Sequence, residues 1–274
     1  LIAVASRVFW VWEDPRIDEV TEMLPGSNCG ACGEAGCRAF AEALIASRIE
    51  PVKCTVMGPD GVVAVASYLG VDAGEANRRV ARLLCAGGSD VAVQQAEYRG
   101  LQSCAAAATV SGGGKGCTWG CLGLADCEAS CTFDAIIMND VGLPVVIPEL
   151  CTACGDCVEA CPKDLFTLMP EDHRLIVQCR SLLEGDTVEK LCAVACNGCG
   201  RCAADAAPGL IRMDRGLAVI DYTQFDLADE SATARCPTNA IVWLEGMQFP
   251  LRSGGALMSA ANRSTSSETG RRTS

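Results

Sequence analysis

The sequence predicts a loop-rich α+β fold in which a small helical N-terminal domain precedes two tandem modules built from short hairpins and helices. Short apolar stretches with helical periodicity, broken by Pro or Gly, fill the region before residue 84. Beyond residue 104, a pattern of cysteines and short apolar runs recurs after 75 residues. The 274 residues also include 20 cysteines, many at steps of three or four, so bound groups rather than one large core organise the chain.

The clearest cysteine motif occupies residues 151–162 and reads Cys-Thr-Ala-Cys-Gly-Asp-Cys-Val-Glu-Ala-Cys-Pro. Its first three cysteines can bind three corners of one iron–sulfur cubane, and Cys161 before the proline can reach a neighbouring cluster. The alternative is a zinc knuckle, but zinc sites usually use two separated Cys-x2-Cys pairs, and the single histidine, His173, lies outside such spacing. The motif therefore predicts [4Fe–4S] clusters and ferredoxin-like modules.

Composition restricts the function further. Disulfides would place the chain outside the cell, whereas cluster thiolates need a reducing compartment, and the spacing favours the thiolates. A formal net charge of −12 and only 5% aromatic residues disfavour nucleic-acid binding. The sequence contains no Walker loop, dinucleotide fingerprint or nucleophile–base pair, so we expect no substrate chemistry, flavin or nucleotide on this chain. Gly112–Lys115 resembles a phosphate loop only superficially and is interpreted as a flexible hinge.

The N-terminal region predicts two parts. Residues 1–13 hold an apolar run far shorter than the roughly 20 residues that span a bilayer. Trp10 and Trp12 suit the interfacial end of a truncated membrane helix, and a short buried helix is the alternative. Residues 14–84 form a cluster domain, with helices expected at 14–24, 38–49, 62–69 and 73–84 and with Arg78, Arg79 and Arg82 on a solvated face.

The first four-cysteine set lies in this domain. Its spacing is Cys29-x2-Cys32-x4-Cys37-x16-Cys54, and the intervening glycines let the backbone approach cluster sulfides. Four cysteines with none left over predict one [4Fe–4S] cluster. A structural zinc is the alternative, because four cysteines alone do not identify their metal.

An internal repeat spans residues 104–237. A shift of 75 residues takes Cys104 to Cys179, Cys117 to Cys192, Cys121 to Cys196, Cys127 to Cys202 and Cys161 to Cys236. Each copy is expected to be one ferredoxin-like module, at 85–175 and 176–250, with hairpins at 135–138 with 145–147 and at 210–213 with 217–220. Residues 251–274, rich in Ser, Thr, Gly and Arg, are expected to form a disordered tail.

The second copy lacks one complete ligand set. The shift carries Cys151, Cys154 and Cys157 onto Asp226, Asp229 and Ala232, and Cys131 near Ala206 or Ala207. In a two-cluster ferredoxin these four cysteines hold one cubane, while the last cysteine of each run crosses to the other cluster. Their joint loss predicts one cluster at Cys131, Cys151, Cys154 and Cys157 in the first copy and one cluster in the second copy at Cys196, Cys199, Cys202 and Cys236.

The remaining cysteines leave two assignments open. In the first copy Leu124 stands where the second copy has Cys199, so the cluster ligands would be Cys117, as the nearest replacement, with Cys121, Cys127 and Cys161; a three-iron cluster is the alternative. The four cysteines left over either hold a fifth cluster where the copies meet or are buried free thiols: Cys85, Cys104, Cys179 and Cys192. The sequence thus predicts four [4Fe–4S] clusters, with a fifth as an open alternative.

Three groups of motifs give the chain a resemblance to the B subunits of Rnf complexes, the iron–sulfur subunits of ion-translocating ferredoxin:NAD oxidoreductases. They are Leu24-Pro25-Gly26-Ser27-Asn28-Cys29-Gly30-Ala31-Cys32-Gly33 with Gly36-Cys37, then Gly120-Cys121-Leu122-Gly123-Leu124-Ala125-Asp126-Cys127, and the ferredoxin runs at 151–162 and 192–202. The resemblance covers about residues 1–245. The second module departs from the pattern, because many relatives keep a complete pair of ferredoxin runs there.

The resemblance implies an electron-transfer subunit of a translocase at the inner (cytoplasmic) membrane, with its cluster domains on the cytoplasmic side. The implied partners are soluble ferredoxin, the other membrane and flavin-carrying Rnf subunits, and the membrane itself through an N-terminal helix; the complex would pump sodium ions or protons. Two other classes stay open. A corrinoid or carbon-monoxide-pathway iron–sulfur protein would need a large barrel domain, for which this chain has no room, and an iron–sulfur scaffold or redox sensor would release its clusters to apo-proteins.

Overall fold

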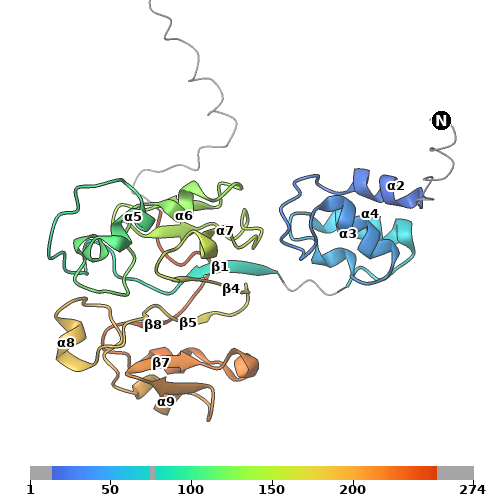
Figure 1. Ribbon diagram of the computed structural model, residues 1–274. Coiled ribbons are helices and arrows are strands. Elements are labelled where there is room, and N and C mark those ends of the chain that lie inside the picture. Colours follow the sequence, from blue (N-terminus) through green and yellow to red (C-terminus); the bar gives the residue numbers. More distant parts are fainter. Residues whose placement is uncertain (1–13, 75–77, 252–274) are drawn as a thin grey trace, which may run out of the picture. The chain divides into compact units, whose positions relative to one another are not determined.

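The computed structural model describes residues 14–74 and 78–251, which fall into two compact units. The first unit contains the described chain up to Arg78 together with Thr152–Cys154, and the second contains Arg79–Cys151 and the described chain from Gly155 onward. Short helices and two-stranded sheets joined by long loops confirm the predicted α+β class (Figure 1). The first unit ends earlier than residue 84 because the residues after Arg78 form a strand of the second unit.

The described part of the first unit contains three α-helices and one 3-10 turn: α2 (Arg16–Met23), α3 (Cys37–Ile45), η1 (Pro51–Lys53) and α4 (Pro59–Leu69). The α2 helix begins where Asp14 Oδ1 accepts the Arg16 N–H at 3.0 Å. The α4 helix begins at a proline, which needs no N–H partner, and ends at Gly70 in the left-handed conformation. These helices confirm the three predicted before residue 70.

One apolar core holds the first unit together. Its buried members come from all three helices and include Val20, Phe40, Leu44 and Val65. Partly buried cysteines pack against this core, so folding of the helices brings cysteines from distant positions to one side of it: Cys32, Cys37 and Cys54.

The helix predicted at 73–84 is wrong for the strand β1 (Arg79–Leu83). It pairs antiparallel with β4 (Phe166–Pro170), and Leu83 lies opposite Phe166. The last four residues of β1 are all buried, and a short run buried on both faces has no periodicity that separates strand from helix. Arg82, predicted on a solvated face, is 2% exposed, and its Nη1 donates to the Gly246 carbonyl at 3.1 Å.

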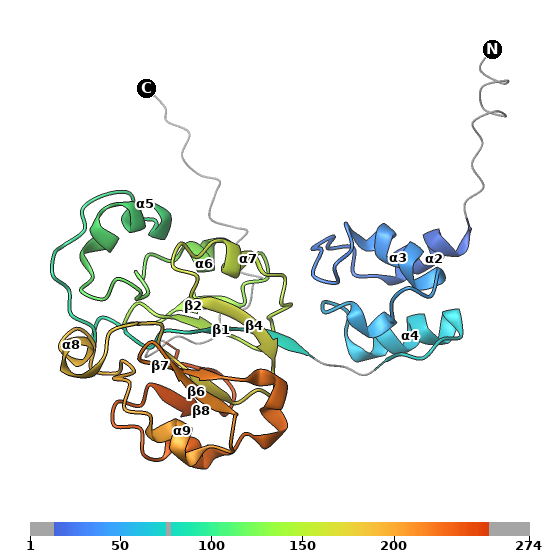
Figure 2. The same cartoon turned by 60° about the horizontal axis from the view of Figure 1, so that its bottom comes forward.

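The second unit contains two modules with the same order of strands. The first module runs from β1 to β4 and encloses the hairpin of β2 (Ile136–Met138) and β3 (Pro144–Val146). Its helical turns are α5 (Cys104–Thr109), η2 (Ser111–Gly114), α6 (Asp126–Ala129) and α7 (Asp156–Glu159). The second module runs from β5 (Leu175–Val177), which pairs antiparallel with β8 (Ile241–Trp243), and encloses the hairpin of β6 (Ile211–Asp214) and β7 (Leu217–Ile220) (Figure 2).

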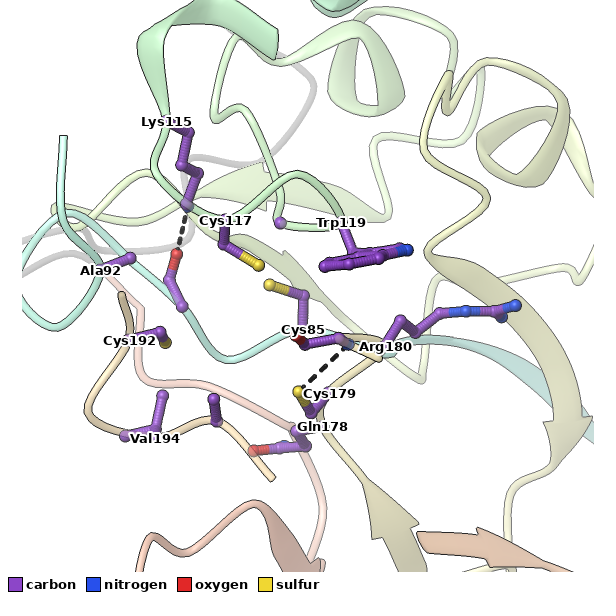
Figure 3. A pocket seen from close by; sticks show the side chains of 14 residues that line it. Cys85, Ala92, Lys115, Cys117, Trp119, Gln178, Cys179, Arg180, Cys192 and Val194 are labelled. Atoms are coloured by element: carbon purple, nitrogen blue, oxygen red, sulfur yellow. Dashed lines mark hydrogen bonds between the residues drawn. The ribbon is translucent and has the colours of Figure 1, made fainter. Parts of the chain in front are cut away.

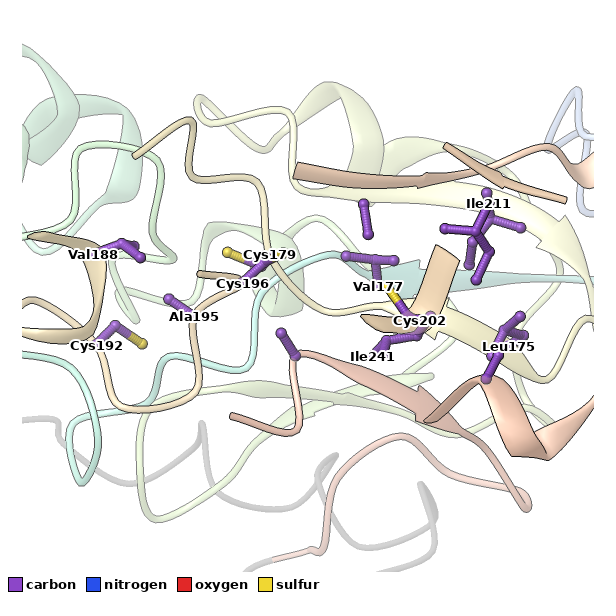
Figure 4. Close-up of a cluster of buried hydrophobic side chains, with 14 of the residues drawn as sticks. Leu175, Val177, Cys179, Val188, Cys192, Ala195, Cys196, Cys202, Ile211 and Ile241 are labelled. Carbon is purple, nitrogen blue, oxygen red and sulfur yellow. The ribbon is translucent and has the colours of Figure 1, made fainter. Parts of the chain in front are cut away.

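The remaining turns of the second module are α8 (Gly185–Glu189), α9 (Arg201–Asp205), η3 (Tyr222–Leu227) and η4 (Glu230–Thr233). Both hairpins agree with the ranges expected from the sequence. Each module has its own buried core, and in the second module cysteines are core members beside aliphatic side chains such as Leu175 and Ile241 (Figure 4). The cysteines are therefore carried by the cores of both modules.

The second module is packed with side chains where the first has its run of three cysteines. Ala232 is 1% exposed, and Asp229 Oδ1 accepts the Ser231 N–H at 2.8 Å, which begins η4. Beside this segment, the ring of His173 stacks on Phe225 at a centroid distance of 4.0 Å and on Tyr222 at 5.3 Å. Apolar and aromatic packing thus fills this part of the module.

Two predicted terminal segments lie outside the described residues: the membrane-helix end at 1–13 and the tail at 251–274, of which only Leu251 is described. Within residues 14–74 and 78–251, no helix combines the length and the apolar character needed to cross a membrane.

Candidate metal centres

The first unit contains a hollow lined by Cys29, Cys32, Cys37 and Cys54. Gly30 and Gly33 adopt φ values of 72° and 89°, which L side chains rarely adopt, and so turn the chain around the hollow. Asn28, also at positive φ, accepts the Cys37 N–H on its Oδ1 at 2.8 Å and fixes the start of α3. The structure therefore gathers the first predicted ligand set around about 310 Å³ of space, open side included.

The thiol of Cys54 shows how this set shares one environment. Burial raises its pKa, and the backbone N–H groups of Met57 and Val56 oppose that rise because they stabilise a thiolate. The neighbouring sulfurs of Cys32 and Cys37 raise it further. Three thiolates this close repel one another, and a bound cation or metal cluster removes that repulsion.

The second module contains a hollow of about 320 Å³ lined by Cys196, Cys199, Cys202 and Cys236. Burial raises the pKa of Cys202 to about 11, with further contributions from the other three sulfurs. At Cys236 burial also raises the pKa, but the N–H groups of Ile241, Thr238 and Ala240 outweigh it and hold the pKa below its usual value. A sulfur surrounded by N–H donors is prepared for a thiolate that binds metal.

In the first module, Cys131, Cys151 and Cys157 pack against one core. The Cys131 sulfur accepts the N–H of Ala135 at 3.3 Å, and the Cys161 sulfur accepts that of Leu165 at 3.5 Å, in both cases from four residues further along the chain. Cys154 follows Cys151 in the loop, after Ala153 at a φ of 56°. Each of these runs therefore aims N–H donors at its cysteine sulfurs.

Cys121, Cys127 and Cys161 lie together, but their neighbour is Cys104 rather than Cys117. Burial raises the pKa of Cys127, and the sulfurs of Cys121, Cys104 and Cys161 add to the rise. Burial likewise raises the pKa of Cys104, whose sulfur faces the N–H groups of Asp126 and Leu124 and lies near Cys161.

Cys117 lies instead at a third four-cysteine hollow, with Cys85, Cys179 and Cys192 (Figure 3). Its volume is about 330 Å³, close to that of the two hollows above. The predicted fifth set contained Cys104 in the place that Cys117 occupies. Three of its four members, Cys85, Cys179 and Cys192, do come together as expected.

Two features of this hollow were not evident from the sequence. Lys115, interpreted as part of a hinge, is only 9% exposed, and its Nζ donates to the carbonyls of Gly87 at 2.5 Å and Cys121 at 2.6 Å. Gly87 and Trp119 also line the hollow. A lysine after three glycines has no periodicity that would signal burial, so only the fold shows its role.

Among residues 14–74 and 78–251, no group of three or more His, Cys, Asp or Glu side chains is arranged to hold a single metal ion. A [4Fe–4S] cluster sets a different requirement, because each of its four irons takes one thiolate and the ligands surround a cube.

Comparisons with known proteins agree with this picture. Residues 24–56 match a family model described as a putative Fe–S cluster, and residues 116–166 match a 4Fe–4S dicluster domain. The chain is 42% identical over 240 residues to the B subunit of the Na⁺-translocating ferredoxin:NAD⁺ oxidoreductase complex of Acetobacterium woodii, a match that covers 88% of this chain and 72% of that protein. It is 37% identical over 241 residues to the B subunit of the ion-translocating oxidoreductase complex of Methanosarcina acetivorans (88% and 91% covered). A third relative is the B subunit of the proton-translocating ferredoxin:NAD⁺ oxidoreductase complex of Clostridium ljungdahlii, 38% identical over 243 residues (88% and 86% covered).

Proposed function

Because the chain belongs to the family of B subunits of ion-translocating oxidoreductase complexes, we propose that it passes electrons between soluble ferredoxin and the membrane and flavin-carrying subunits of such a complex. The family membership confirms the resemblance drawn from the sequence motifs and makes the chain an iron–sulfur subunit of an oxidoreductase that translocates ions. Association with ferredoxin, the cytoplasmic side and a membrane anchor at residues 1–13 are parts of the proposal.

The observation that carries the proposal is the set of hollows lined by cysteines of ferredoxin-type motifs. Two properties fit a [4Fe–4S] cluster. Backbone N–H groups face the cysteine sulfurs, as at Cys131, Cys161 and Cys236, and so offset the negative charge of a cluster. Apolar cores support the cysteines from behind, which limits access of water to the bound group.

Bound [4Fe–4S] clusters would supply one-electron transfer without proton or group transfer. The chain's residues hold and tune them. The proposed ligands in the first unit are Cys29, Cys32, Cys37 and Cys54. In the second unit they are Cys131, Cys151, Cys154 and Cys157, then Cys196, Cys199, Cys202 and Cys236, and a further set that includes Cys121, Cys127 and Cys161. The rigid cores keep the ligands in place between redox states, so little reorganisation accompanies each transfer.

An iron–sulfur scaffold or sensor uses the same ligands and is separated by experiment. The full chain, purified and kept anaerobic, is titrated with reduced ferredoxin while iron is counted before and after. We expect reversible reduction with no loss of iron. Release of iron, transfer of clusters to an apo-protein, or failure of reduced ferredoxin to reduce any cluster would reject electron transfer as the function.

A matched pair of variants checks the ligand assignment in the first unit. Cys54→Ala should lower the iron content by about four atoms per chain, because a [4Fe–4S] cluster with three thiolates is labile. Thr55→Ala changes the neighbouring residue of the same hollow and should leave the iron content unchanged.

A further inference from the structure

The third hollow of the second unit is lined by four cysteines that no sequence motif groups together: Cys85, Cys117, Cys179 and Cys192 (Figure 3). We call it the cysteine cage. Its volume is nearly that of the hollows lined by the two four-cysteine motif sets. In Figure 3 the sulfurs of Cys85 and Cys117 point toward each other inside it. The cage thus has both the size and the ligands of the other centres.

Gly87 keeps the cage open. A Cβ atom at this position would lie 3.2 Å from the Cys192 sulfur and 3.6 Å from the Cys85 sulfur. Two sulfurs from segments about 100 residues apart in the chain therefore converge on the space that the glycine leaves free. Any larger residue at 87 would project a side chain toward these sulfurs.

Lys115 brings a buried positive charge to the cage. Its Nζ is held by the carbonyls of Gly87 and Cys121, and none of the ion pairs found in the described residues involves it. A buried ammonium without an anion is costly. Its charge acts on Cys117 and Cys192, where it opposes the rise in pKa that burial causes. Thiolates around a metal cluster would supply the missing negative charge.

Strand pairing shows that Cys85 is the counterpart of Cys179. Leu83 pairs with Phe166 at the end of β1, Val177 pairs with Ile241 at the end of β5, and each cage cysteine follows two residues later. The Cys121 N–H donates to the Cys85 sulfur at 3.4 Å, and the N–H of Cys196, the repeat partner of Cys121, likewise faces the Cys179 sulfur. The cage therefore takes one equivalent pair of cysteines from each module.

The same alignment explains Cys104. Cys85 and Cys117 are 32 positions apart, whereas Cys179 and Cys192 are 13 apart, so the first module carries an insertion that contains Cys104. The sulfur of Cys104 faces the N–H of Leu124, the residue that replaces a cysteine of the second module. Ser103 Oγ and the Ala105 N–H both donate to Asp126 Oδ2, at 3.1 and 2.9 Å, and hold the insertion at this place.

We propose that Cys85, Cys117, Cys179 and Cys192 bind a further [4Fe–4S] cluster, and that Cys104, in place of Cys117, is the fourth ligand beside Cys121, Cys127 and Cys161. This inference rests on the proposed function and extends it. All 20 cysteines then serve as ligands of five clusters. Because Cys121 and Cys196 each direct an N–H at a cage sulfur, the cage joins the cluster sites of the two modules.

Iron and sulfide analysis of the full chain, with Mössbauer and low-temperature EPR spectra, tests the cage. Cys192→Ala should lower the iron content by about four atoms per chain or leave a three-iron signal, with the spectra of the other clusters unchanged. Gly87→Val should have the same effect although every cysteine is kept, and Val194→Ala, at the same hollow, should have none. Full iron content in Cys192→Ala, or a single zinc ion in the wild-type cage, would overturn the proposal.

Double variants separate the two assignments of Cys104 and Cys117. Cys161→Ala removes one cluster on either assignment. Adding Cys117→Ala should remove a second cluster, about eight irons in total, whereas adding Cys104→Ala should remove nothing more. The opposite pattern would overturn the exchange.

Spectra of the clusters that remain report whether each variant has folded. If the wild-type chain carries clusters that ferredoxin does not reduce, the proposed function fails. If ferredoxin reduces them but the cage variants keep full iron, only the cage fails.

Discussion

Gln248 locks the C-terminal segment of the second unit onto β1. Its Oε1 accepts the Leu83 N–H at 2.9 Å, its Nε2 donates to the Leu83 carbonyl at 2.5 Å, and Leu83 is 1% exposed. Gln248→Met keeps the length of the side chain but leaves both backbone groups unpaired. Each unpaired buried group costs about 1–3 kcal/mol, so we expect a loss of about 2–4 kcal/mol after partial access of water.

For a unit of this size, that loss corresponds to a fall in apparent Tm of about 5–12 °C. The assay is anaerobic thermal unfolding at one fixed scan rate, followed by far-UV circular dichroism and by the visible absorption of the clusters, because unfolding that releases clusters is irreversible. Met247→Ala, at an exposed neighbour, is the control. A fall no larger than that of the control would show that the two hydrogen bonds contribute little and would refute the reasoning.

Three further predictions address single side chains. Cys161→Ala should damage the cluster of Cys121 and Cys127 before the cluster of Cys151, as measured by low-temperature EPR; the reverse order would contradict the crossed ligation. Thr238→Val removes the hydroxyl 3.9 Å from the Cys236 sulfur and should lower that cluster's midpoint potential in a redox titration, while Thr233→Val should not. Burial lowers the pKa of His173 below 6.5, so its contribution to stability is present above that pH and is lost as the pH falls toward the folded-state pKa. Thermal unfolding between about pH 7.5 and 5.5 should therefore depend on pH more steeply in the wild type than in His173→Phe, and equal slopes would exclude this role.

Local signals in the sequence predicted the helices of the first unit and both hairpins. The α4 helix is marked by a proline at its start and a glycine after its end, and these residues act on their own backbone whatever surrounds them. The β1 strand was missed because its partner β4 lies far along the chain, and its buried arginine looked like a surface residue. Pairing at this distance leaves no local signature.

The candidate centres show the same division. Spacing alone grouped the cysteines around the first hollow and around that of the second module, because each set lies on closely spaced turns. The shift of 75 residues paired Cys104 with Cys179, whereas the strands pair Cys85 with Cys179, since an insertion displaces the register of the first module only before Cys117. Lys115 could not be placed from sequence, because its partners are backbone carbonyls.

The insertion between Val93 and Gly113 has a consequence for protein engineering. By length and position it resembles a surface loop that a protein chemist would shorten or use to carry a tag. Trimming it would remove Cys104, so this loop is no more replaceable than a core strand. Restoring a cysteine by Leu124→Cys should make the loop dispensable again, and a shortened chain with that one substitution should regain the iron lost on trimming.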